Sequence, residues 1–326
     1  MSSLLGSIPS PSSGQLDLFG LSIHAYGLMI ALGVVAGVWL AGRRMEAAGV
    51  GTRDDMSSIA MWAVGADIVG ARLYYIVTDK SQPWKEPGRW LKVWEGGLGI
   101  PGGLLAGVLV AVWAIKRRGL PVGGVLNAAA PGVPLAQAIG RLGNWWNQEL
   151  FGRPTDLPWA LEVSDATAEK AGYAAGTTFH PTFLYEMLWN LALCVLLIVI
   201  GKRFAIRGGR LLVIYVLGYA IGRFWVEGLR IDPANSGGGW RLNQWTAFVA
   251  GLLAAGYLLV DWLRHRHDEP VAATDAADDT TDADATDDEP IEEATDAADD
   301  AGDDVEVDAP TASGDEAAAD YLPEDD

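Results

Sequence analysis

The chain has 326 residues, half of them hydrophobic, and a formal net charge of −19. Residues 268–326 contain 25 Asp and Glu but no Lys or Arg, so the remainder holds all 23 Lys and Arg against 17 acidic residues. A basic, apolar body with an acidic C-terminal segment favours a membrane protein, and no nucleic-acid partner is expected. The single cysteine, Cys194, excludes an intramolecular disulfide and a thiolate metal cluster.

Seven hydrophobic spans are predicted, each near the ~20 residues that a helix needs to cross a bilayer. They are residues 24–42, 57–78, 97–115, 121–139, 182–201, 210–228 and 244–263. The expected fold is an all-α polytopic membrane protein, with an extracytoplasmic N-terminus at 1–20 and a transmembrane domain at 21–265. Residues 152–181 are expected to form a small extracytoplasmic cap. The acidic tail at 268–326 is expected to be disordered in the cytoplasm, because it cannot bury enough apolar surface.

Two of these spans carry residues that interrupt regular helices. The third opens with a glycine-rich run at 97–103, which predicts a bent or re-entrant start, and the fourth contains Pro131 and Pro134. Irregular backbone at membrane depth is tolerated where it lines a cavity and not where it faces lipid. Both segments are therefore expected to face the protein interior.

The distribution of Lys and Arg predicts the orientation of the spans. With the N-terminus outside, 12 of these residues fall at cytoplasmic positions close to helix ends, and 9 fall in outer loops, Arg141 among them. Membrane proteins carry an excess of positive charge on the cytoplasmic side. The sequence therefore predicts an N-terminus outside the cell and a C-terminus in the cytoplasm.

The most informative stretch is residues 140–152, which directly follows the fourth apolar span. It places Arg141, Asn144, Asn147 and Glu149 among small glycines, where a bilayer favours leucine. Such polar groups at a membrane edge are costly and mark functional sites. A guanidinium matches phosphate oxygens and an asparagine suits glycerol hydroxyls or ester carbonyls. The stretch is expected to bind an anionic lipid headgroup; a charged loop that only flanks a helix is the alternative.

The sixth span carries a second charged group. Arg223 and Glu227 are four residues apart and share one helix face, with Arg230 near the same stripe. A plain intrahelical ion pair is one interpretation. In the other, Arg223 and Arg141 come from different helices and clamp one phosphodiester, whose departing charge they stabilise in the transition state.

Two further side chains are open to a functional and a structural interpretation. Tyr26, at the outer end of the first span, either anchors the chain at the membrane interface or directs its hydroxyl into a cavity. His180, beside a proline at the start of the fifth span, either accepts a proton or is structural. The four histidines are scattered, so no metal site is expected, and no hydrolase triad motif is present.

Taken together, these motifs resemble the bacterial phosphatidylglycerol–prolipoprotein diacylglyceryl transferases. The resemblance runs in order over about residues 15–265 and leaves out the acidic tail. The matching segments are 23–28, 70–73, 94–97, 140–149, 180–186 and 223–230, with Gln244 at the start of the last span.

The resemblance implies a seven-helix bundle with a lipid cavity open sideways to the bilayer. It implies transfer of the diacylglyceryl group of phosphatidylglycerol to the lipobox cysteine of a preprolipoprotein, in the bacterial plasma membrane and without a cofactor. Arg141 matches the family's phosphatidylglycerol-binding arginine, and Arg223 matches its other essential arginine. The other positions that the resemblance marks as functional or lining the site are Tyr26, Asn144, Glu149, Gly152, Glu227 and Arg230.

Two positions depart from the family pattern. Pro101 stands where many members have a histidine, so that histidine cannot be the base here, and residues 127–131 lack the acidic residue that many members place before Ala-Pro. The proton acceptor stays open among Glu227, Glu149, His180, Tyr26 and bulk water. A membrane transporter for an anionic solute is the competing interpretation. It predicts polar residues that continue to both membrane faces, whereas here they concentrate in the outer half.

Overall fold

The computed structural model describes residues 7–18, 21–79, 88, 90, 96–204, 206–233 and 236–266. The acidic tail at 268–326, for which the sequence predicts disorder, lies outside the described residues. Trp94 and Glu95 of the glycine-rich motif before the third span also lie outside them.

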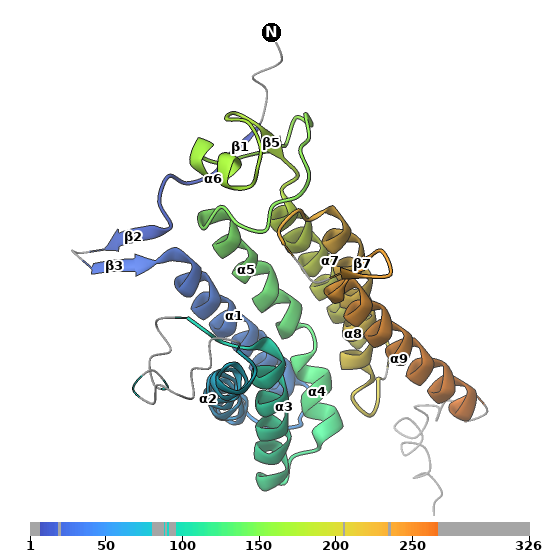
Figure 1. Cartoon of the computed structure of the whole chain (residues 1–326). Coiled ribbons are helices and arrows are strands. Elements are labelled where there is room, and N and C mark those ends of the chain that lie inside the picture. Colours follow the sequence, from blue (N-terminus) through green and yellow to red (C-terminus); the bar gives the residue numbers. More distant parts are fainter. Residues whose placement is uncertain are drawn as a thin grey trace, which may run out of the picture. The chain divides into compact units, whose positions relative to one another are not determined.

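Seven helical stretches of the described chain are long and apolar enough to cross a membrane, which confirms the predicted all-α polytopic fold (Figure 1). They are α1 (Ala25–Ala47), α2 (Arg53–Thr78), α3 (Ile100–Arg117), α4 (Val122–Ala129) together with α5 (Gly132–Trp146), α7 (Thr182–Arg203), α8 (Arg210–Leu229) and α9 (Leu242–His265). Large apolar side chains point outward from them, such as Leu253 on α9, which is 70% exposed. A surface of this kind suits lipid rather than water.

The fourth span is broken into α4 and α5 at Pro131, which precedes the first residue of α5 and has no N–H to continue the helix. Both helices are largely buried or half-buried, as expected for an interior segment. However, α5 continues to Trp146, well past the predicted end at residue 139. The prediction that placed Arg141 in an outer loop was therefore wrong. Hydropathy ends the span too early because the polar side chains of α5 face other helices instead of lipid.

The third span also differs from its prediction. Residues 96–99 are not helical, and α3 begins at Ile100 as a regular helix with Pro101 in its first turn, where proline is tolerated. The segment is not re-entrant. Its glycine face lies against α2, where a Cβ on Gly102 would lie 2.4 Å from the carbonyl oxygen of Gly70, and Ala114 and Ile115 near its end are buried. Another side of this helix faces outward, as Leu105 shows with 64% exposure.

Small residues fix the position of α5 against α1. A Cβ on Gly33 would lie 2.6 Å from the carbonyl oxygen of Ala136, and one on Gly37 would lie 2.7 Å from that of Gly132. Glycines four residues apart let two membrane helices approach at their backbones. This contact sets the height and rotation of α5, and with them the direction of Arg141.

A small layer of short strands and one short helix covers one end of the membrane-spanning helices (Figure 1). Its sheet has the order β1 (Ile8–Pro9), β4 (Leu161–Glu162) and β5 (Thr178–Phe179), with β1 parallel to β4 and β4 antiparallel to β5. The short helix α6 (Asp165–Lys170) packs there through Ala168, in an apolar cluster with Phe151, Leu161 and Phe179. Two hairpins complete the strands: β2 (Gln15–Leu18) with β3 (Leu21–His24), and β6 (Ser236–Gly237) with β7 (Trp240–Arg241).

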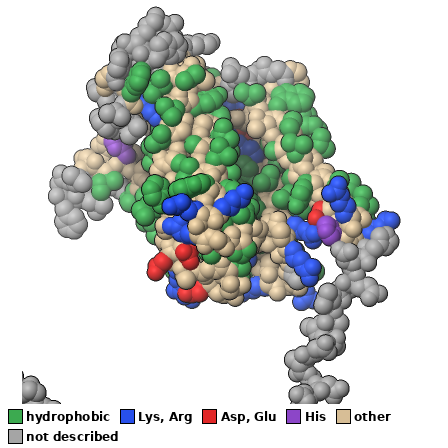
Figure 2. Space-filling view, turned by 90° about the horizontal axis from the view of Figure 1, so that it is seen from below, with side chains coloured by type: hydrophobic (Ala, Val, Ile, Leu, Met, Phe, Trp, Pro, Cys, Tyr) green, Lys and Arg blue, Asp and Glu red, His purple; other side chains and the backbone are tan. Residues whose placement is uncertain are grey.

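Lys and Arg side chains gather at the opposite end, which Figure 2 shows from below. They come from the last turns of α1, α3, α7 and α9 and the first turns of α2 and α8. The molecule therefore has a capped end and a basic end, separated by the length of its spans.

Candidate functional site

Charged side chains from four helices meet a few residues below the capped end. Arg141 comes from the last turns of α5 and Glu186 from the first turns of α7, while Arg223 and Glu227 come from the last turns of α8. Arg241 directly precedes α9. Because the chain direction alternates between these helices, their capped ends bring together residues far apart in the sequence.

Glu186 joins the two arginines that the sequence singles out. Its Oε2 lies 2.6 Å from Nη2 of Arg141, and its Oε1 lies 3.1 Å from Nη1 of Arg223. The three side chains are 7%, 20% and 15% exposed, respectively. The predicted meeting of Arg141 and Arg223 from separate helices therefore occurs, through a carboxylate to which the sequence analysis assigned no role. An acidic residue within an apolar span was the available signal.

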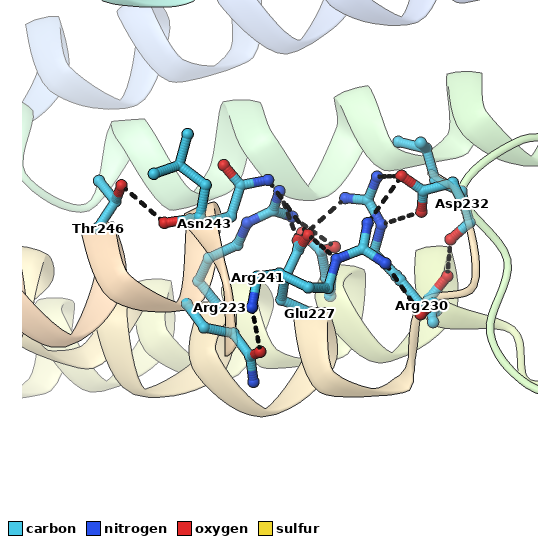
Figure 3. Close-up of polar contacts among 12 residues, drawn as sticks. Arg223, Glu227, Arg230, Asp232, Arg241, Asn243 and Thr246 are labelled. Atoms are coloured by element: carbon cyan, nitrogen blue, oxygen red, sulfur yellow. Dashed lines mark hydrogen bonds and ion pairs between the residues drawn. The ribbon is translucent and has the colours of Figure 1, made fainter. Parts of the chain in front are cut away.

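Glu227 is the centre of the second half of the network (Figure 3). Its side chain is fully buried and accepts contacts from Arg223 at 2.9 Å, Arg230 at 3.3 Å and Arg241 at 2.7 Å. Asn243 on α9 adds a hydrogen bond of 3.2 Å. The intrahelical pair with Arg223 is thus one part of a larger interhelical structure, because a fully buried carboxylate needs several donors to offset its desolvation.

Asp232 closes the network at its outer edge, next to Arg230 in Figure 3. Its two oxygens lie 2.8 Å from Nε of Arg230 and 2.9 Å from Nη2 of Arg241. Burial by itself raises the pKa of Asp232, but hydrogen bonds and charge from Arg230 and Arg241 outweigh it and hold the pKa below its usual value. Asp232, Arg241 and Asn243 were not identified from the sequence.

The direct ion pairs of the network join four arginines and three carboxylates, and Glu149 lies one hydrogen bond further on, beyond Asn144. The guanidinium groups are those of Arg141, Arg223, Arg230 and Arg241, and the carboxylates are those of Glu186, Glu227 and Asp232. The Nε groups of Arg141 and Arg223 have no hydrogen-bond partner among the described residues. Guanidinium donors that are left unused in a partly buried cluster are suited to hydrogen bonds with an anionic group.

Asn144 connects this network to Glu149. Its Oδ1 accepts a hydrogen bond of 3.0 Å from Arg141, and its Nδ2 donates one of 2.8 Å to Glu149. Gln148 and Leu150, on either side of Glu149, have φ of 51° and 61°, a left-handed conformation unusual for residues with side chains. The chain therefore turns sharply after α5, and the turn directs Glu149 back to Asn144.

Asn147 lies at the edge of the same group. It follows the last residue of α5, and its Nδ2 donates a hydrogen bond of 3.4 Å to Glu149. The other half of its amide faces Gly14: a Cβ on that glycine would lie 3.1 Å from Oδ1 of Asn147. Asn147 is thus placed between Glu149 and the N-terminal segment, and it does not contact the arginines directly.

Tyr26 lies on the other side of α5, against α1. A Cβ on Gly143 would lie 2.7 Å from its ring, and its hydroxyl has no hydrogen-bond partner within the described chain. The ring is therefore one helix face away from Arg141 and Asn144, at a half-exposed position.

Gly152 and His180 hold the cap onto the helices. The N–H of Gly152 donates to the carbonyl of His180 at 2.9 Å, and Gly152 pairs with Arg230 in an isolated antiparallel bridge. A Cβ on Gly152 would lie 2.8 Å from that of His180, which explains the glycine. The His180 ring lies 3.0 Å from the hydroxyl of Tyr185 and not in the arginine network, so the structure favours its structural interpretation.

The two positions that depart from the family pattern have structural explanations here. Pro101 stands in the first turn of α3, as described above. Asn127 donates to the carbonyl of Ile206 at 2.8 Å and accepts from the N–H of Leu211 at 3.0 Å, so it ties α4 to the start of α8. An amide can make both bonds at once, and an ionised carboxylate could make only the second.

A narrow gap beside Arg223 and Glu186 is too small to hold a water molecule, and it is lined by Trp189, Asn190 and Tyr219, among others. Asn190 is 2% exposed, and its Oδ1 has no hydrogen-bond partner in the described part of the chain. Beyond it, towards the basic end, Leu193 and Leu197 lie in an apolar cluster. The polar network therefore does not continue through this part of the molecule, as a path for an anionic solute would require.

Comparisons with known proteins identify the family of this chain. A family model described as prolipoprotein diacylglyceryl transferase matches residues 14–260. A phosphatidylglycerol–prolipoprotein diacylglyceryl transferase of Cutibacterium acnes is 48% identical over 259 residues, which are 78% of this chain and 86% of that protein. The protein of the same name from Streptomyces griseus is 44% identical over 78% of this chain and 78% of its own length. The phosphatidylglycerol–prolipoprotein diacylglyceryl transferase 2 of Streptomyces coelicolor is also 44% identical, over 86% of this chain and 91% of its own length. The chain is a multi-pass membrane protein and belongs to the prolipoprotein diacylglyceryl transferase family.

Proposed function

We propose that this protein transfers the diacylglyceryl group of phosphatidylglycerol to the thiol of a lipobox cysteine in a prolipoprotein and releases glycerol phosphate. The observation that carries the proposal is the convergence of Arg141 and Arg223 from α5 and α8 on one buried carboxylate. The Nε donors that both arginines leave unused suit the oxygens of a phosphodiester. The names of the relatives supply the substrates.

The chemistry needs little from the protein beyond positioning and charge. The substrate thiol attacks the glycerol carbon that carries the phosphate ester, the C–O bond breaks, and a thioether forms. The leaving group is a phosphate monoester. Arg141 and Arg223 bind the phosphate through the donors that Glu186 leaves unused, and they stabilise the charge that grows as the ester departs. Thiolate is the reactive form of cysteine, and nearby guanidinium groups favour it.

Glu186 acts as a spacer between the two arginines in this scheme. Its two oxygens fix the guanidinium groups at the two sides of one carboxylate, so both are in place before the lipid arrives. Charges that are already oriented need no reorganisation during the reaction. Glu227, with its contacts to three arginines, holds Arg223, and Asn144 holds Arg141. The thiol proton passes to water or to a side chain near the network, with Glu149, His180, Tyr26 and Glu227 as the candidates.

The orientation of the protein follows from the charge pattern. We place the capped end with the arginine network on the outer side of the plasma membrane and the basic end in the cytoplasm, in line with the positive-inside rule. The N-terminus is then outside and the C-terminus inside. The lipobox peptide of the client lipoprotein would reach the network from the outer face, and the lipid would reach it from the bilayer.

The test is a transfer assay with purified protein, labelled phosphatidylglycerol and a lipobox peptide. Arg141→Ala and Arg223→Ala should each lower turnover by at least about a hundredfold, because each removes a fixed charge from the transition state. Arg210→Ala is the matched control: this arginine also lies on α8 in an interhelical pair, 2.7 Å from Asp261, but at the basic end. It should keep near-normal turnover.

Two results would overturn the proposal. Near-full transfer by Arg223→Ala would show that the pair of arginines does not act on the phosphate. Flux of an anionic solute without any thioether product in the wild-type protein would assign it to the transporter class instead.

A further inference from the structure

A second groove lies at the basic end of the molecule, between α1 and α7. Its volume is 540 Å³, and Trp39, Leu40 and Ile198 contribute apolar walls. The remaining lining includes three cations from the last turns of the two helices, Arg43, Arg44 and Lys202. We call this site the α1–α7 groove. Because the arginine network lies at the capped end, the two sites are separated by most of the membrane thickness.

The cations of the α1–α7 groove have no carboxylate partner, although several arginines at the same end have one. At the same end, Arg53 pairs with Glu46, Arg118 lies 3.7 Å from Asp55, and Arg210 pairs with Asp261. None of the three groove cations has an ion pair within the described chain. General attraction to a membrane surface explains exposed basic helix ends, such as Lys116 and Arg117 on α3, but it does not explain a guanidinium whose Nε is buried, as that of Arg44 is.

Arg44 is the most constrained of the three. Its Nε is buried without a hydrogen-bond partner among the described residues, and a Cβ on Gly201 of α7 would lie 2.8 Å from its Nη2. The guanidinium therefore lies directly against the backbone of the neighbouring helix. A cation in this position loses water and gains no anion from the protein, which is unfavourable unless a ligand supplies one.

Arg43 and the groove walls indicate what that ligand is. The guanidinium of Arg43 lies 5.0 Å from the centre of the Trp39 ring, and this ring is 56% exposed at the membrane surface of α1. An aromatic side chain beside cations at the end of an apolar groove suits a phosphate with acyl chains. A free phosphate ion would leave the apolar walls unused.

We propose that the α1–α7 groove binds one anionic phospholipid of the leaflet at the basic end. Its phosphodiester lies among Arg43, Arg44 and Lys202, and its acyl chains follow Trp39, Leu40 and Ile198. A zwitterionic lipid brings a positive headgroup towards three cations and is bound more weakly. The site does not take part in the transfer reaction.

The experiment is native mass spectrometry of the detergent-solubilised full chain, titrated with dioleoyl phosphatidylglycerol or dioleoyl phosphatidylcholine. The double variant Arg43→Gln, Lys202→Gln should bind phosphatidylglycerol about thirtyfold more weakly at one site, about fivefold for each charge removed. The control is Lys116→Gln, Arg117→Gln, which removes two charges at the same end. Arg117 lies outside the groove, 5.8 Å from the centre of the Trp113 ring, so this cation and ring resemble the pair of Arg43 and Trp39 within the groove.

The outcomes separate the groove from a general charge effect. Weaker binding of phosphatidylglycerol by the groove variant alone supports the proposal. Equally weakened binding in both double variants, or unchanged binding in both, overturns it. Ala47→Phe fills the groove without a change of charge and should also abolish the specific binding. If Ala47→Phe still binds phosphatidylglycerol as the wild type does, the lipid does not bind in the α1–α7 groove. All variants should keep transferase turnover with saturating substrate, which shows that they fold and keeps this test independent of the proposed function.

Discussion

Arg141 and Arg223 are held on opposite oxygens of the same carboxylate, Glu186, at 2.6 Å and 3.1 Å. The two arginines belong to helices that are joined by α7 and not by direct contact between their side chains. The site is therefore assembled only when α5, α7 and α8 pack together, and a change at Glu186 acts on both arginines at once.

Glu186→Gln should test this joint positioning. The amide keeps the shape of the side chain, but its NH₂ group faces one of the arginines and cannot accept a hydrogen bond from it. We expect kcat to fall about a hundredfold, because a displacement of the guanidinium groups by up to about 1 Å is enough to misalign them with the phosphate. The KM for phosphatidylglycerol should not rise, since the site gains net positive charge. Steady-state kinetics with the exposed variant Glu169→Gln as control measures both values; an unchanged kcat contradicts the spacer role.

Glu227→Gln should act mainly on stability. The carboxylate is fully buried among three arginines, and removal of its charge leaves those cations without compensation. Breaking such a pair costs about 3–5 kcal/mol. Thermal unfolding in detergent should show a large fall in midpoint. Asp261→Asn, which breaks the partly exposed pair with Arg210, should cause a smaller one. A fall in Glu227→Gln no larger than in this control would count against the role of Glu227 as the centre of the network.

The stability of the network should depend on pH through Asp232. Its folded pKa lies below the ordinary value because Arg230 and Arg241 outweigh the effect of burial. A carboxylate with a lowered folded pKa contributes stability above its unfolded pKa of about 3.9 and loses it as the pH falls through the folded value. The unfolding midpoint of the wild-type protein should therefore fall more steeply below about pH 4 than that of Asp232→Asn. Parallel pH profiles for the two proteins would contradict this.

The glycine contact between α1 and α5 should be essential for the site. Gly33→Leu and Gly37→Leu place side chains where backbone oxygens of α5 lie within 2.7 Å of the first added carbon. We expect a loss of about 1–3 kcal/mol or more in stability and a loss of turnover, because α5 carries Arg141. Gly65→Leu is the control, since nothing lies within 4 Å of a Cβ added there. Normal unfolding and turnover in Gly37→Leu would show that α5 is positioned by other contacts.

Much of the fold could be predicted from the sequence, because a bilayer imposes length and apolarity on every span. Each of the seven predicted spans corresponds to a helical stretch, and the break in the fourth falls at Pro131 as its chemistry requires. The predicted end of a span was wrong where polar residues continue the helix beyond its apolar part. Arg141 was placed in a loop because its side chain lowers the local hydropathy, although the helix runs on to Trp146.

The candidate site was predicted in part. The order of the motifs was sufficient to identify Arg141, Asn144, Arg223, Glu227 and Arg230, all of which join one network. It did not identify Glu186 or Arg241, whose roles depend on the rotation and height of α7 and α9 relative to α8. It also did not separate His180, which contacts Tyr185, from the residues beside the arginines.

The sequence by itself determined that this chain crosses the membrane several times, and it determined which charged residues interrupt the apolar spans. Hydropathy and motif spacing are properties of a segment, so they can be read without knowledge of its neighbours. Only the tertiary structure decided which carboxylate meets which guanidinium. Those pairs join different helices, and their geometry follows from glycine contacts and helix packing that no single segment contains.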